Sequence, residues 1–246
     1  MRRYLKYLYA LVFLGLFWQI GSFFINSAVC PDPIAVMERL AADTQTVSYW
    51  KHVGVSIFRI VVALMVAFIT AVPLGLFLGM IPKYDRLIKP FIYLAYPIPK
   101  IVLLPLVLLF FGIGNTGKIA MLTMILFFQL LITARDASRS IGRDAVYSLK
   151  SLGGTNRHLF YHVVWPACLP SVFTALRVAT GTLVAVLFFI ESISTRYGLG
   201  YYILDAWGRA DTTQIFVGMI SLAVLGVFFY EFFDILERTY CRWNHL

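Results

Sequence analysis

Among the ionisable residues within or at the ends of long apolar blocks, four are our candidates for acting on a solute. They are Arg59, Lys100, Arg177 and Glu191. If these blocks cross a membrane, a charge inside them is costly and often marks a translocation pathway. We expect Lys100 and Arg177 to give such a pathway a positive potential that favours an anionic solute. The alternative is structural pairing, or extension toward the membrane surface, as for Arg59 near a helix end.

Nucleotide and metal chemistry have little support in the sequence. Residues 112–118 satisfy the pattern G-x-x-x-x-G-K. A phosphate-binding loop follows a strand and ends in Ser or Thr, whereas residue 119 is Ile. A zinc site needs closely spaced cysteines and histidines. The four histidines and three cysteines of this chain are scattered instead. We therefore expect no cofactor or metal in this chain and no enzymatic activity.

The composition indicates an integral membrane protein. Of 246 residues, 60% are hydrophobic and 13% are charged, and the mean hydropathy is +0.81. Soluble domains carry about 25% charged residues. The formal net charge is +9, but the basic residues lie between apolar blocks and form no single basic face, so we expect no nucleic-acid partner.

Apolar blocks of membrane-spanning length predict an all-α polytopic protein with about six transmembrane helices. Pro97, Pro99 and Pro105 lie in the third block, so we expect that span to be broken or partly interfacial. The first block is either a retained helix, which we favour, or a cleaved signal peptide. The six blocks cover residues 7–28, 53–81, 91–112, 119–134, 168–190 and 213–233.

Lysine and arginine are distributed unevenly between alternate loops. They are frequent at the N-terminus, in 82–90, in 135–167 and at the C-terminus, and sparser in the other connections. Positively charged loops stay in the cytoplasm. The sequence therefore predicts that both termini and the 135–167 loop are cytoplasmic, and that membrane lipid surrounds the spans.

The long loop at 138–167 has its own helical pattern. Apolar residues recur at helical spacing in its first half, glycines at 153 and 154 end that helix, and Thr155 or Asn156 can cap a second one. Prolines at 166 and 170 punctuate the entry to the fifth span. A short amphipathic helix of this kind docks into a groove on a partner protein or anchors to lipid headgroups, and the pattern alone leaves both open. The apolar positions are Ala145, Leu149, Leu152, Leu159, Phe160 and Val163.

This loop resembles that of binding-protein-dependent ABC transporter permeases, usually written E-A-A, three residues, G, nine residues, I-x-L-P. Gly153, Val163 and the Trp165-Pro166 pair match its spacing. Tyr147, Ser148 and Leu149 stand at the E-A-A positions, so the usual acidic residue is absent, and Asp144 lies one turn earlier. The resemblance covers about residues 50 to 238 and extends to the nitrate, taurine and aliphatic sulfonate branch. Further matching segments are 56–59, 73–79, 98–106, 111–114, 153–154, 166–170, 191 and 198–200.

The resemblance implies a fold of the type I ABC importer permease (MetI-like) class and a permease subunit without catalytic residues. Its implied partners are two cytoplasmic ATPase subunits that bind ATP and magnesium, a second permease copy, usually identical, and an extracytoplasmic solute-binding protein. Glu191 and residues 192–211 are the candidates for an outer gate and docking surface; an ordinary connecting loop is the alternative. The implied ATPase contacts are Asp144, Tyr147, Ser148, Leu149, Leu152, Gly153, Gly154, Phe160, Val163 and Pro166.

The resemblance to this branch favours a small oxyanion, sulfonate or taurine-like solute. It also implies that the protein lies in the bacterial inner membrane. A thiamine-precursor pyrimidine or a riboflavin-type compound is the alternative, and a secondary transporter is a more distant one. A secondary transporter would normally carry acidic coupling residues within its spans, and most spans here lack them. We expect an N-terminal helix and outer loop at 1–50, a transport core at 51–238 and a cytoplasmic tail at 239–246.

Overall fold

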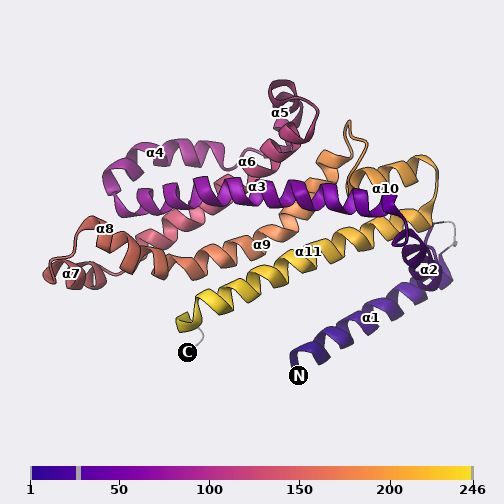
Figure 1. The fold of residues 1–246 in the computed structure, drawn as a ribbon, viewed down its shortest axis with the longest axis horizontal. Helices are drawn as coiled ribbons and strands as arrows, with labels where there is room; N and C mark the ends of the chain where they lie inside the picture. Colours follow the sequence, from indigo (N-terminus) through magenta and orange to yellow (C-terminus); the bar gives the residue numbers. More distant parts are fainter. Residues whose placement is uncertain (1, 26–28, 245–246) are drawn as a thin grey trace. The chain divides into compact units, whose positions relative to one another are not determined.

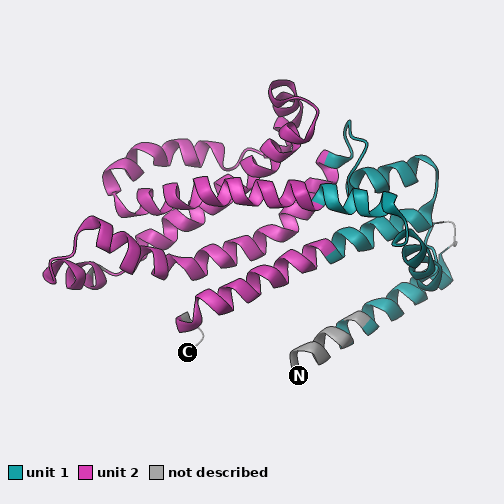
Figure 2. Ribbon diagram, in the orientation of Figure 1, with its two compact units in different colours: residues 1–56, 191–224 teal, residues 57–190, 225–246 magenta. Residues whose placement is uncertain are grey.

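The computed structural model describes residues 2–25 and 29–244, and within them the chain is helical with no strand. The chain forms two compact units, which Figure 2 shows in teal and magenta. The first comprises Met1–Ser56 with Glu191–Val224, and the second Ile57–Ile190 with Leu225–Leu246. The division at 1–50, 51–238 and 239–246 stays a prediction.

Four helices are long and apolar enough to cross a membrane (Figure 1). They are α3 (Val47–Met80), α6 (Asn115–Arg139), the run Asn156–Glu191 that contains α9 (Trp165–Glu191), and α11 (Thr212–Tyr240). These correspond to the predicted second, fourth, fifth and sixth spans. Each begins before its predicted apolar block, and all but α3 also end after it.

The predicted third span is a bent pair of helices. The first helix is α4 (Pro82–Ala95); after a break come the 3-10 turn η1 (Lys100–Leu103) and α5 (Leu104–Phe111), at 80° to α4. The expected break is therefore present. The predicted loop at 82–90 is wrong, because Pro82 occupies the first helical turn, where its missing N–H has no role, and starts α4.

The first predicted span, 7–28, corresponds to α1 (Arg2–Phe24), and residues 26–28 lie outside the described part. Its apolar segment Val12–Phe24 is shorter than a full span. By length and composition the described residues therefore contain four membrane-crossing helices, or five if the bent pair is one span, against the predicted six.

The smaller unit packs around a short amphipathic helix, α2 (Pro33–Asp43), with α10 (Leu199–Gly208) and the first half of α11. Asp32 caps α2 by accepting a hydrogen bond from the Ile34 N–H at 2.7 Å. Trp18 of α1 donates to the Pro31 carbonyl at 3.1 Å and stacks on Phe216. The buried core comprises Val36, Tyr49, Tyr202 and Val217.

In the larger unit, α3 and α6 approach each other at two glycines. A Cβ on Gly75 would lie 2.5 Å from the Leu131 carbonyl oxygen, and one on Gly79 would lie 2.5 Å from the Arg135 oxygen. The Ser138 hydroxyl donates to the Leu76 carbonyl across the same contact. Small residues permit this distance between membrane helices, so Gly75 and Gly79, four residues apart on α3, have a packing role.

Candidate functional site

The segment that joins α6 to α9 consists of α7 (Arg143–Ser151), a glycine turn, α8 (Asn156–Leu159) and the π turn η2 (Phe160–Val164). We call Arg143–Val164 the coupling segment. Tyr147 is 59% exposed and Leu152, the C-cap residue, is 85% exposed. Asp144 and Ser148 are exposed as well. The predicted first helix is therefore present, and it presents an apolar residue with polar neighbours to its surroundings.

Two glycines set the turn after α7, each for its own reason. Gly153 has φ of +78°, a conformation that costs other L-residues strain. Gly154 donates its N–H to the Leu149 carbonyl, and a Cβ there would lie 2.6 Å from the Leu149 Cγ. The turn thus closes tightly over the last residues of α7 and holds Leu152 at its outer edge.

Thr155 is the cap of α8, which decides between the two predicted candidates. Its hydroxyl accepts from the His158 N–H, and the His158 imidazole accepts from the Thr155 N–H, so the two residues form a reciprocal capping box. Leu159 is buried, while Phe160 and Val163 are half-buried.

The last part of the coupling segment, residues 156–164, runs into α9 without a break, and the two prolines lie at this entry. Trp165 donates its N–H to the Phe160 carbonyl, five residues earlier, which is the π pattern. Proline lacks an N–H, so Pro166 and Pro170 interrupt the regular ladder, and a wider turn accommodates the change. α8, η2 and α9 therefore form one continuous helical run, Asn156–Glu191.

At the other end, α6 is fixed to α4 by a buried ion cluster. Arg135, 2% exposed at its side chain, donates to Asp85 through Nε and Nη2, and Arg139 donates to Asp85 at 2.8 Å. Asp136 accepts from Arg135 as well, at 3.1 Å. We call Asp85, Arg135 and Arg139 the α4–α6 ion cluster. It lies four residues before the coupling segment and was not predicted; its signal in the sequence was the single acidic residue in 82–90.

Arg177 lies in a neutralised cluster between α9 and α11. Its guanidinium is 2.7 Å from an Asp234 oxygen and 3.3 Å from a Glu237 oxygen, and Arg238 also pairs with Asp234. Two arginines and two carboxylates balance one another. Of the two sequence alternatives for Arg177, this geometry favours structural pairing.

Arg59 and Glu191 also have polar partners. Arg59 donates to the Asn115 side-chain oxygen through Nε at 2.9 Å and Nη2 at 2.8 Å. Glu191 is fully buried and accepts from the Ser56 hydroxyl and from the Gly200 N–H. Gly198, with φ of +132°, passes so close that a Cβ would lie 2.5 Å from the Glu191 carboxyl carbon. Both residues therefore contribute to fixed networks.

Lys100 differs from the three other pathway candidates. Its ammonium donates to the Tyr96 carbonyl and lies 5.0 Å and 4.9 Å from the Tyr96 and Phe128 ring centres. No carboxylate of the described residues lies within ion-pair distance of it. A cavity of about 490 Å³ opens beside it, lined by Tyr96, Pro97, Ile98, Pro99, Ile101, Ile125, Phe128, Gln129, Thr182 and Val186.

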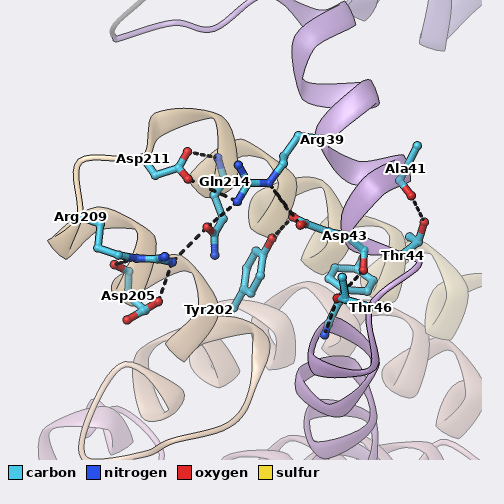
Figure 3. Close-up of polar contacts among 11 residues, drawn as sticks. Arg39, Ala41, Asp43, Thr44, Thr46, Tyr202, Asp205, Arg209, Asp211 and Gln214 are labelled. Atoms are coloured by element: carbon cyan, nitrogen blue, oxygen red, sulfur yellow. Dashed lines mark hydrogen bonds and ion pairs between the residues drawn. The ribbon is translucent and has the colours of Figure 1, made fainter.

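Residues 192–211, the predicted outer segment, join a polar network in the smaller unit (Figure 3). Arg39 of α2 pairs with Asp43 and Asp211 and donates to Gln214. Arg209 pairs with Asp205 and donates to the same Gln214 oxygen. We call the following set the polar cluster: Arg39, Asp43, Tyr202, Asp205, Arg209, Asp211 and Gln214.

A cavity of about 270 Å³ adjoins the polar cluster. Tyr202 donates to Asp43 in it; burial, and then this hydrogen bond, raise the pKa of the Tyr202 phenol, which remains a donor at neutral pH. The wall is therefore polar and presents both signs of charge. It is lined by Asp43, Thr46, Ser48, Tyr49, His52, Tyr202, Asp205, Arg209 and Gln214.

Residues 112–118, which match the phosphate-loop pattern G-x-x-x-x-G-K, span the turn between α5 and α6 and the first residues of α6. Gly112 ends α5 and α6 begins at Asn115, with no strand before the turn. Lys118 is buried and donates to the Ile113 carbonyl at 3.1 Å. The lysine that would reach a phosphate in a true loop thus points back into the turn.

Comparison with known proteins gives a consistent family. A model described as "Binding-protein-dependent transport system inner membrane component" matches residues 71–240. The chain is 26% identical over 239 residues to the taurine transport system permease protein TauC of Escherichia coli (strain K12), covering 95% of this chain and 87% of that protein. It is 29% identical to the putative aliphatic sulfonates transport permease protein SsuC of the same organism, covering 92% and 87%.

Two further similarities concern a different solute and the fold. The formylaminopyrimidine transport permease protein ThiX of Halalkalibacterium halodurans is 26% identical, covering 92% of this chain and 91% of that protein. Inward-facing structures of the MetNI methionine ABC transporter superpose with a TM-score of 0.66 at 20% identity, covering 77% of this chain and 94% of the matched chain. The latter supports the predicted MetI-like fold.

Proposed function

Because this chain belongs to the family of binding-protein-dependent transport system inner membrane components, and so is a permease subunit of an ABC transporter, we propose that it imports a small organic anion of the sulfonate type. ATP is hydrolysed by a separate subunit, and a solute-binding protein is the other partner of such a system. The prediction of a non-enzymatic membrane subunit is confirmed by the family.

The coupling segment is the observation that carries the proposed role of a permease subunit driven by an ATPase. Tyr147 on α7 and Leu152 at its C-cap are exposed, and the glycine turn fixes the end of this helix. They offer an apolar contact of the kind that enters a groove on another protein. We propose that this groove is on the cytoplasmic ATPase. Asp144, one turn before the position of the missing acidic residue, supplies the nearest carboxylate to the contact.

In the proposed mechanism, two ATPase subunits approach each other when they bind ATP, and each coupling segment moves with its ATPase. The segment continues into α9 through η2, so the fifth span follows the displacement. The α4–α6 ion cluster carries the motion to α4 in the same way. Rigid-body motion of packed helices then switches access from one side of the membrane to the other.

The proposal includes an orientation and an assembly. Both termini and the coupling segment lie in the cytoplasm, as the positive-inside pattern predicts. The polar cluster of the smaller unit then faces the solute-binding protein outside, and Glu191 with Gly198 stabilises the base of that surface. Two copies of the permease, usually identical in this family, form the pathway.

The solute class is supported by the first two relatives named above, whose printed names concern taurine and aliphatic sulfonates. A pyrimidine is the second candidate, because ThiX, with a similar identity and coverage, is a formylaminopyrimidine permease. The charge of Lys100 beside its cavity favours the anion over the neutral pyrimidine.

Uptake by the assembled importer tests the proposal. The permease, its ATPase and its solute-binding protein would be reconstituted in liposomes, and ATP-dependent uptake of taurine, ethanesulfonate and formylaminopyrimidine compared. Import of either sulfonate supports the proposal, and import of the pyrimidine alone overturns the solute class. Labelling of Tyr147→Cys by an impermeant thiol reagent, against wild type, tests the orientation: reaction only from the cytoplasmic side is expected, and reaction only from outside contradicts it.

A further inference from the structure

Two neighbouring cavities of the larger unit share one residue, Gln129, and the inference drawn from them rests on the proposed function. One is the 490 Å³ cavity beside Lys100, and the other, of about 510 Å³, lies between α6 and α9. The second is lined by Gln129, Thr133, Ala167, Pro170, Ser171, Thr174, Ala175 and Val178.

The residues that line both cavities follow helical spacing. On α6 they are Ile125, Phe128, Gln129 and Thr133, and on α9 they recur every three or four positions from 167 to 186. Side chains at this spacing share one face of a helix. The two cavities therefore form one groove along facing stripes of α6 and α9, with Lys100 at one part of it. We call it the Lys100–Gln129 groove.

Four polar side chains of this groove have no hydrogen-bond partner within the described residues, whereas the Thr133 hydroxyl donates to the Gln129 carbonyl at 3.0 Å. The Gln129 amide and the hydroxyls of Ser171, Thr174 and Thr182 make no hydrogen bond to any described part of the chain. A polar group facing hydrocarbon without a partner is unfavourable by several kcal/mol. The groove is therefore unsuited to lipid, and its polar groups are available to a solute or to water.

The charge of Lys100 is available for the same reason. Two other cations of the larger unit, Arg177 and Arg135, face carboxylates at ion-pair distance. Lys100 instead faces two aromatic rings and a carbonyl. Cation–π contacts hold an ammonium in place while leaving its charge uncompensated. An anion entering the groove would supply the missing counter-charge.

We infer that the Lys100–Gln129 groove contacts the solute during passage and selects a small organic anion with an apolar body. The Lys100 ammonium binds the oxyanion head, and the Gln129 amide and Thr182 hydroxyl donate further hydrogen bonds. The Phe128 and Tyr96 rings contact the short hydrocarbon part. Selectivity then lies partly in this chain as well as in the solute-binding protein.

The test compares uptake with ATP hydrolysis in the complete reconstituted importer. Lys100→Gln should lower the initial rate of taurine and ethanesulfonate uptake by roughly 10- to 100-fold, the range for a lost hydrogen bond to a charged group. ATP hydrolysis stimulated by the loaded solute-binding protein should remain, because the coupling segment is unchanged. Lys100→Arg should keep most of the uptake, and Gln129→Leu should lower it.

Lys83→Gln is the matched control, since Lys83 is an exposed lysine of α4 outside the groove; its uptake should equal wild type. Size-exclusion chromatography would establish that each variant assembles. Wild-type uptake in Lys100→Gln and Gln129→Leu overturns the inference while the proposed function stands. Absence of sulfonate import by the wild-type importer overturns the proposed function itself.

The accessibility of the groove to water gives a second, independent test of the inference. The thiol introduced by Gln129→Cys should react with methanethiosulfonate ethylsulfonate, a small anionic thiol reagent, faster than the native cysteines, of which Cys168 and Cys241 are buried. An introduced thiol that stays unreactive both with and without nucleotide would mean that a second copy or lipid covers this face, and that result also overturns the inference.

Discussion

The α4–α6 ion cluster and the coupling segment are neighbours along the chain, yet their side chains are held in opposite ways. Arg135 is 2% exposed and donates to a carboxylate of another helix. Leu152 is 85% exposed at the C-cap of α7, and the turn after this helix is closed by the hydrogen bond from the Gly154 N–H to the Leu149 carbonyl. Under the proposed mechanism this difference separates two roles: the buried ion cluster would transmit displacement, and the exposed coupling segment would receive it from the ATPase.

Removing the carboxylate of the ion cluster should give the largest effect on stability. Asp85→Ala leaves Arg135 buried without its main counter-charge, which costs about 3–5 kcal/mol. The melting temperature of the detergent-purified permease should fall clearly. Asp144→Ala is the matched control, because Asp144 is an exposed first-turn carboxylate of α7. An equal fall in both variants would abolish the contrast between the two regions.

The close approach of α3 and α6 gives a second contrast, of intermediate size. Gly79→Ala places a methyl group 2.5 Å from a backbone oxygen, and overpacking of this kind costs about 1–3 kcal/mol. Gly142→Ala, just before α7, meets nothing within 4 Å and should leave the melting temperature unchanged. A wild-type melting temperature for Gly79→Ala would show that the helices separate without cost.

Much of the helix pattern was predictable because membrane spans are long, apolar and local in sequence. The blocks at 53–81, 119–134, 168–190 and 213–233 each became one helix, and the glycine turn at 153–154 followed from residue type alone. The bent third span was expected from its prolines, although α4 began earlier than predicted.

The partners of the charged residues were not predictable, because they are distant in sequence. Arg177 meets Asp234 across 57 positions, Arg59 meets Asn115 across 56, and Glu191 meets Ser56 across 135. Residue type marked these charges as notable, but only tertiary geometry separates them from Lys100. Gln129 went unnoticed although it is the only amide in the 119–134 block.

The glycine turn supplies a smaller effect within the coupling segment. Gly153→Ala must hold an L-residue at positive φ, which costs about 1–2 kcal/mol locally. No neighbour lies within 4 Å of the added methyl, so the cost comes from the backbone alone. We expect a small decrease in melting temperature and a larger decrease in uptake, since the turn orients α7.

Gly153→Asn is the control for that variant, because asparagine tolerates the left-handed conformation better than alanine. Its uptake should lie between wild type and Gly153→Ala. Equal uptake in all three proteins would mean that the turn geometry does not orient the coupling segment.

The smallest effect on stability should come from Leu152, and it is the sharpest test of the comparison. Leu152→Asp alters a side chain that is 85% exposed, so the melting temperature should change by no more than about 0.5 kcal/mol in equivalent free energy. Binding of the ATPase should nevertheless weaken at least tenfold, because a charge then enters an apolar contact; pull-down at graded ATPase concentrations measures it. Lys150→Asp, two residues earlier on the same exposed segment, separates a general charge effect from the loss of the apolar contact. If Leu152→Asp binds the ATPase as wild type does, the ATPase does not attach at the exposed surface of the coupling segment. The contrast between a buried region that transmits motion and an exposed region that receives it would then be wrong for this chain.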